Sequence, residues 1–227
     1  MFPILLTTTN ENQPDAVVAW DPLGGCPIVT FAGETAHRGS VTQFAEGVVC
    51  AAAKKPFIQL WNFHSASSSY KRILTKGLVS AIALTPDSEC IFVAFEREIY
   101  VYQTSSGCLI GVLGGSHSAK IGEIRLANWL TPENTMLITA DVSGFLACWN
   151  LCALVDELNL LTSKPRVSDT NASVVEHATL ELGNYSQSPP VWYTLQASHY
   201  LPRINIFRQL VLVTGSEGLK VISVIKK

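Results

Sequence analysis

The fold of this chain is decided by three short stretches, AVVAWDPLGGC at residues 16–26, FIQLWNFHSAS at 57–67 and EIYVYQTSSGC at 98–108. Each stretch is an apolar run that closes on an aromatic residue, in turn Trp20, Trp61 and Tyr102. Neighbouring aromatics are 41 residues apart, since 61 − 20 and 102 − 61 are both 41. A small polar residue and then a turn follow each aromatic. The chain is therefore built from a repeated unit of about 40 residues.

A fourth copy, FLACWNLCALV at 145–155, closes on Trp149. A period of about 40–45 residues, with an aromatic–acid or aromatic–amide pair at the end of a strand, is typical of a WD-repeat propeller blade. The third unit also shows the four strands of a blade, and its first turn is Thr85-Pro-Asp87. We therefore predict an all-β fold, an incomplete WD-repeat β-propeller of about five blades of antiparallel strands.

The repeat predicts one domain, a partial propeller over residues 1–227. Its blades are expected at roughly 1–36, 37–76, 77–116, 117–200 and 201–227. The period breaks within the fourth blade, where an inserted loop covers 155–191 and delays the outer strand to 192–197. The first blade lacks its inner strand, and the fifth has Ile222 in the aromatic's place. Two incomplete blades predict unpaired sheet edges, so we expect a fragment or short form that aggregates alone or needs a partner.

Composition narrows the class of protein. Hydrophobic residues make up 48% of the chain and charged residues 15%, which indicates a compact, core-rich protein. The formal charge of −2 gives no electrostatic reason to expect direct nucleic-acid binding. No apolar stretch is long enough for a membrane span, and the first residues lack the pattern of a signal peptide. Six cysteines lie in or beside predicted strands, which favours reduced thiols in the cytosol or nucleus over disulfides.

Histidines recur where blades begin, at His37, His117 and His199. In WD-repeat proteins a histidine at this position forms hydrogen bonds within its blade, to the aromatic and to a turn residue. Metal ligation is the alternative, but these histidines come one per blade and are expected far apart. Ser143 stands where the fourth blade would have its turn aspartate, so we expect a weaker network there.

Residue pairs that could carry chemistry are few. Cys148 and Cys152 are four apart, but no second ligand pair follows at metal spacing. Ser116, His117 and Asp141 could be arranged as a hydrolase triad, although no nucleophile-elbow pattern accompanies them. Trp129 and Trp192 lie outside the once-per-blade rhythm and serve either packing or partner binding. We predict no catalytic, cofactor-binding or metal-binding residues and no cofactor.

The segment after Trp149 resembles one family of WD-repeat proteins. The strings ACWNLCALVDEL, SHYLPRINIF and LVTGSEGLKVIS, with the insertion between the first two, are similar to the WD repeat-containing protein 18 family. That family includes the WD-repeat subunit of the Rix/Ipi pre-ribosome maturation complex. The similarity covers about the first half of the family's usual length. Tyr102 and Ile222 replace tryptophans here, and the family's remaining blades and C-terminal tail are absent.

The resemblance implies a non-enzymatic scaffold subunit of a nuclear complex for rRNA processing and large ribosomal subunit assembly. Its expected partners are protein subunits of that complex and, indirectly, an AAA ATPase. Direct nucleic-acid or membrane binding is not expected, and self-association stays open. The alternative is an adaptor in another assembly, such as a ubiquitin ligase substrate receptor or a coat complex, because propellers serve many such roles.

Overall fold

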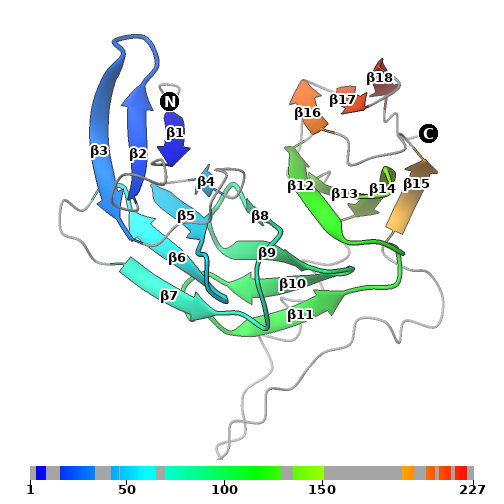
Figure 1. Cartoon of the computed structure of the whole chain (residues 1–227), viewed down its shortest axis with the longest axis horizontal. Coiled ribbons are helices and arrows are strands. Elements are labelled where there is room, and N and C mark those ends of the chain that lie inside the picture. Colours follow the sequence, from blue (N-terminus) through cyan, green and yellow to red (C-terminus); the bar gives the residue numbers. More distant parts are fainter. Residues whose placement is uncertain are drawn as a thin grey trace, which may run out of the picture. The chain divides into compact units, whose positions relative to one another are not determined.

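The chain folds into five antiparallel β-sheets in a computed structural model (Figure 1). The structure describes residues 4–8, 16–33, 42–45, 47–64, 70–128, 135–150, 191–196, 203–207, 210–215 and 218–223. The first sheet has the order β1-β2-β3 and the last β16-β17-β18. The three sheets between them have four strands each, in the orders β4-β5-β6-β7, β11-β10-β9-β8 and β12-β13-β14-β15. The described residues contain no helix.

The strands follow one another along the chain with short turns inside each sheet. Their bounds are β1 Leu5–Thr8, β2 Ala16–Asp21, β3 Cys26–Ala32, β4 Thr42–Ala45, β5 Val48–Ala52, β6 Phe57–Asn62, β7 Tyr70–Leu74, β8 Ala81–Leu84, β9 Cys90–Phe95, β10 Glu98–Gln103, β11 Leu109–Leu113, β12 Ile121–Asn128, β13 Thr135–Asp141, β14 Phe145–Asn150, β15 Val191–Gln196, β16 Arg203–Phe207, β17 Leu210–Gly215 and β18 Gly218–Ser223.

The repeat seen in the sequence corresponds to one strand in each sheet. The strands β2, β6, β10, β14 and β18 are each six residues long, and their fifth residues are Trp20, Trp61, Tyr102, Trp149 and Ile222. The first and last sheets have three strands rather than four. The predicted fold class is therefore confirmed as an all-β, incomplete WD-repeat propeller.

The turn after the aromatic is built in the same way in two sheets. Gly25 N–H donates to the carbonyl of Asp21 at 2.8 Å, and Gly107 N–H donates to the carbonyl of Gln103 at 2.7 Å. Both glycines have positive φ, +66° and +76°, a conformation that costs a side chain but not glycine. This requirement explains why glycine stands five positions after the aromatic in these two copies.

The strand expected after the insertion is present. In the register of β14 with β15, Ala147 lies opposite Thr194 and Trp149 opposite Val191. The fourth sheet is therefore completed by a strand that lies some 40 residues further along the chain. Residues 151–190, which contain nearly all of the insertion, lie outside the described residues.

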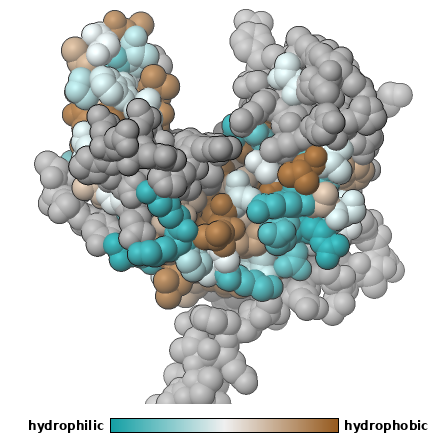
Figure 2. Space-filling view, viewed as in Figure 1, coloured by the Kyte–Doolittle hydropathy of each residue, from teal (hydrophilic) through white to brown (hydrophobic). Residues whose placement is uncertain are grey.

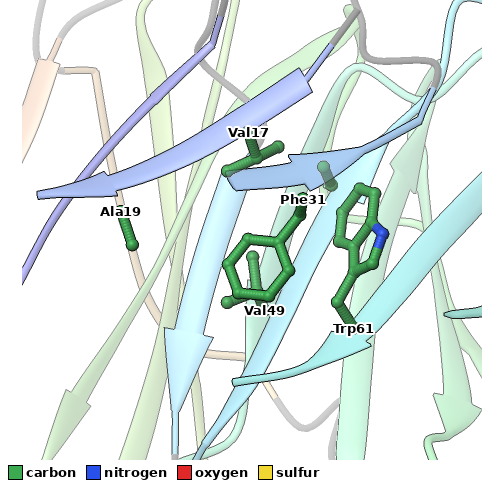
Figure 3. Close-up of a cluster of buried hydrophobic side chains, with 6 residues drawn as sticks. Val17, Ala19, Phe31, Val49 and Trp61 are labelled. Atoms are coloured by element: carbon green, nitrogen blue, oxygen red, sulfur yellow. The ribbon is translucent and has the colours of Figure 1, made fainter. Parts of the chain in front are cut away.

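The chain divides into two compact units, and each is described by itself. One consists of Met1–Phe95 with Gln103–Cys108, and the other of Glu96–Tyr102 with Leu109–Lys227. In the first unit the core joins the first two sheets through Val17, Ala19, Phe31, Val49, Ala51 and Trp61 (Figure 3). The rings of Phe31 and Trp61 lie 5.8 Å apart between centroids, and Trp61 Nε1–H donates to the carbonyl of Ala32 at 3.2 Å. In the second unit β12 contacts β16.

Candidate functional site

The fourth sheet contains a buried network of four polar side chains. His117 Nδ1 lies 3.0 Å from Asp141 Oδ2, and His117 Nε2 lies 2.7 Å from Thr139 Oγ1. Trp149 Nε1–H donates to the same Thr139 hydroxyl at 3.0 Å. All four residues are buried. The histidine predicted to bond within its blade therefore does so in the fourth sheet, through a threonine that the sequence analysis did not identify.

Asp141 also organises the turn between β13 and β14. Its Oδ1 accepts hydrogen bonds from Ser143 N–H at 2.9 Å, from the Ser143 hydroxyl at 2.5 Å and from Phe145 N–H at 3.1 Å. Our expectation of a weaker network around Ser143 is wrong. The aspartate stands two residues earlier, at the start of the turn, and Ser143 is one of its donors.

The charge state of the network follows from its burial. Desolvation lowers the pKa of His117 below its ordinary value of 6.5, although its hydrogen bond to Asp141 acts to raise it. Burial alone would raise the pKa of Asp141, but hydrogen bonds from Ser143, His117 and Phe145 outweigh it and lower that pKa. The network therefore holds a neutral imidazole and a carboxylate. Nδ1–H then donates to Asp141, and Nε2 accepts from the Thr139 hydroxyl, which also lies 3.3 Å from the Ala147 carbonyl.

This arrangement places His117 and Asp141 together, as the triad hypothesis required, but it does not form a triad. The second ring nitrogen contacts Thr139 and not Ser116. The imidazole side chain is only 1% exposed, and its edge packs against the Phe145 ring with centroids 5.7 Å apart. A general base must reach a substrate proton, which this ring cannot do. The geometry supports a role in holding β13, β14, the turn between them and the segment before β12 together.

Acid is expected to weaken this network. The unfolded chain protonates His117 near pH 6.5, whereas the folded chain resists protonation, so the contribution to stability is complete above that pH and is lost as pH falls below it. Asp141 adds a second loss below about pH 4 for the same reason. Through His117, the free energy of unfolding changes by at most about 1.4 kcal/mol per pH unit.

Urea unfolding between pH 7.5 and 5.5 measures this change. His117→Gln should flatten the profile, and identical profiles for both proteins would contradict the assignment.

The first sheet contains a hydrogen bond equivalent to the one between Trp149 and Thr139. Trp20 Nε1–H donates to Thr7 Oγ1 at 2.7 Å. The strand registers make Thr7 the counterpart of Thr139, because each lies two residues beyond the residue opposite its tryptophan, Leu5 or Leu137. This signal is hard to find in the sequence because the tryptophan follows the threonine by 13 residues in one sheet and by 10 in the other.

The second sheet has an apolar residue in place of the threonine. Its counterpart of Thr139 is Ala51, since Val49 lies opposite Trp61. Gln59 lies opposite Ala51 and is fully buried, and its amide has no hydrogen-bond partner among the described residues.

The histidines His37 and His199 lie outside the described residues, as do Trp129 and the side chain of Trp192.

The cysteines of the described residues are free thiols that are not grouped with other metal ligands. Burial raises the pKa of the Cys148 thiol to about 11 and that of Cys50 to about 12, which disfavours the thiolate that binds metals. Cys26 and Cys108 are exposed, and the five cysteines in the described part of the chain are all free thiols. Cys152 lies outside that part. In the described residues, no three His, Cys, Asp or Glu side chains are grouped to hold a metal ion.

Large apolar side chains are exposed on the first sheet. Leu5 on β1, Leu23 in the β2–β3 turn and Ile28 on β3 are 53%, 81% and 50% exposed. Hydrophobic residues are visible at the surface in Figure 2 where Figure 1 draws the β2–β3 hairpin. Exposed apolar residues that gather on one sheet are typical of protein contact surfaces.

Within the described ranges, no helix is long and apolar enough to span a membrane.

Known proteins support this interpretation of the fold. No family model matches the chain. WD repeat-containing protein 18 of Danio rerio is 21% identical over 164 residues, which cover 72% of this chain and 37% of that protein. The pre-rRNA-processing protein pro-1 of Caenorhabditis elegans is 23% identical over 62% of this chain and 27% of its own length. The chain thus spans between about a quarter and two fifths of these relatives.

Solved structures agree on the fold. A chain in the crystal structure of the mitotic checkpoint complex matches 81% of this chain and 46% of its own length, with a TM-score of 0.54 and 13% identity. This neighbour is of the WD40 type and at this identity supports the fold alone. Taken with the sheet architecture, the sequence matches show that this chain is similar to WD-repeat proteins such as WD repeat-containing protein 18.

Proposed function

We propose that this chain is a non-enzymatic scaffold subunit of a nuclear complex that processes rRNA and assembles the large ribosomal subunit. The observation that carries the proposal is its similarity to WD-repeat relatives, two of which are named as pre-rRNA-processing proteins. The chemistry of the fourth sheet supports a scaffold, since the buried histidine and carboxylate form hydrogen bonds within the sheet.

The proposed partners are protein subunits of a pre-ribosome maturation complex and, through them, an AAA ATPase. The proposed location is the nucleus, in nucleolus or nucleoplasm. The exposed apolar side chains of the first sheet support protein contacts. We also propose that residues 1–227 act as one partial propeller, with blades at roughly 1–36, 37–76, 77–116, 117–200 and 201–227 and an inserted loop at 155–191.

Affinity purification from nuclear extract tests the proposal. A tagged chain is expected to recover pre-ribosomal proteins in quantities well above those recovered by an unrelated WD-repeat propeller with the same tag. Mass spectrometry of the eluates identifies the partners. Recovery of ubiquitin ligase or coat subunits in place of pre-ribosomal proteins would support the adaptor alternative and contradict the rRNA-processing role.

A further inference from the structure

The acidic and basic residues of this chain are unevenly distributed. Residues 47–86 contain no aspartate or glutamate, but they contain five of the 16 lysines and arginines. The rest of the chain therefore has 11 basic and 18 acidic residues, a formal charge of −7. The basic stretch contains three strands of the second sheet, β5, β6 and β7. A local excess of positive charge on a net-negative protein favours negatively charged partners at that place.

Hydrogen bonds bring several of these residues to one end of the second sheet. Thr75 N–H donates to the carbonyl of Pro56 at 2.9 Å, which joins the end of β7 to the turn between β5 and β6. In the pairing of β6 with β7, Phe57 lies opposite Leu74. The exposed side chains of these two joined segments are here called the basic–leucine surface and are Lys54, Lys55, Arg72, Leu74, Lys76 and Leu78.

The two leucines distinguish this surface from a simple patch of charge. Leu74 is 78% exposed and Leu78 is 63% exposed. Leu74 points outward because Ile73, its neighbour on the strand, is buried. Arg72 lies on the same face of β7, with its guanidinium 5.0 Å from the centroid of the Phe57 ring. Exposed leucines beside basic side chains suit a partner that is both acidic and apolar.

The loop that bears Lys76 and Leu78 is held at both ends. Thr75 Oγ1–H donates to the carbonyl of Gly77 at 2.9 Å. Ser80 donates to the carbonyl of Ala94 from its backbone N–H at 3.0 Å and from its hydroxyl at 3.1 Å. A preformed surface loses less conformational entropy when it binds a partner.

We propose that the basic–leucine surface binds an acidic, leucine-containing segment of a partner protein. The inference deepens the scaffold function proposed above and rests on it. Carboxylates of the segment would pair with the lysines and Arg72, and its apolar side chains would cover Leu74 and Leu78. A nucleic-acid backbone would satisfy the charges but leave both leucines exposed to water, so the observations favour a protein.

Fluorescence anisotropy with the full chain tests the inference. The probe is a labelled peptide of alternating glutamate and leucine, compared with a glutamate–serine peptide and a polyuridine RNA. The glutamate–leucine peptide is expected to bind most tightly. Its Kd should rise about tenfold in Leu74→Ser/Leu78→Ser and again about tenfold in Lys54→Glu/Lys55→Glu, with weaker binding at high salt. Val142→Ser is the control, because Val142 is 45% exposed in the turn between β13 and β14, on another sheet, and it should leave the Kd unchanged.

Three results would overturn the inference. These are no saturable binding of the peptide, an equal loss in Val142→Ser, or tighter RNA binding that is insensitive to the leucine substitutions. The last result would assign the surface to nucleic acid. If the peptide fails while the tagged chain still recovers pre-ribosomal proteins from nuclear extract, only this surface is wrong. Peptide binding without that recovery would instead remove the rRNA-processing role.

Discussion

Asp141→Ala is expected to lower the free energy of unfolding by about 3–5 kcal/mol, the cost of removing one partner from a buried charged network. The reason is the number of groups that lose their acceptor together. Asp141 accepts from Ser143 N–H, the Ser143 hydroxyl, Phe145 N–H and His117 Nδ1. The buried His117 donor would lose its acceptor and keep its desolvation cost, and the partly exposed donors of Ser143 and Phe145 would lose the bonds that fix the turn. Urea unfolding of the variant against the unmodified chain measures the loss.

Asp21→Ala is the matched control for that change. Asp21 also accepts a hydrogen bond in a turn, from Leu23 N–H at 2.9 Å, but it is only partly buried. Its loss is expected to cost about 1 kcal/mol or less, because water can replace the missing acceptor. A result within 1 kcal/mol of the unmodified chain for Asp141→Ala would contradict the proposed importance of the network.

Trp149→Ala is expected to cost a similar amount, on the order of 3–5 kcal/mol. The indole is 1% exposed and is among the largest fully buried side chains in the described residues. Alanine would leave a cavity in the fourth sheet and remove the donor to Thr139. The same urea experiment measures the change.

Two further variants separate packing from hydrogen bonding at this position. Trp149→Phe keeps most of the apolar bulk and loses only the Nε1–H donor, so its cost should be about 1–2 kcal/mol. Trp20→Ala removes the same type of bond, to Thr7, from a partly exposed site. It should therefore cost clearly less than Trp149→Ala. Equal losses at the two tryptophans would mean that burial does not set the cost.

Sequence reasoning worked where the signal is local. The aromatic at the end of a strand, the polar residue after it and the turn glycine all lie within a few residues of one another. Trp20, Trp61, Tyr102 and Trp149 accordingly occupy the same position in their strands in the structure. The resemblance based on the segment after Trp149 also held, since the curated relatives include WD repeat-containing protein 18.

Sequence reasoning failed where partners are distant along the chain. Thr139 and Thr7 were not identified, because the spacing from threonine to tryptophan depends on the length of the connection between two strands. The turn aspartate was expected at position 143, whereas Asp141 has this role two residues earlier. A shift of two residues leaves the alternation of side chains unchanged, so the strand pattern does not fix where the aspartate stands.

The sequence by itself determined the repeat, the strand class and the charge asymmetry of residues 47–86, because period, turn chemistry and charge are properties of neighbouring residues. Only the tertiary structure decided how the buried polar network of the fourth sheet is connected, through Thr139 and Asp141. It also decided that Leu74 and Leu78 lie exposed beside the lysines. Strand register and burial arise from contacts between distant segments, and a one-residue change of register reverses which side chains face inward.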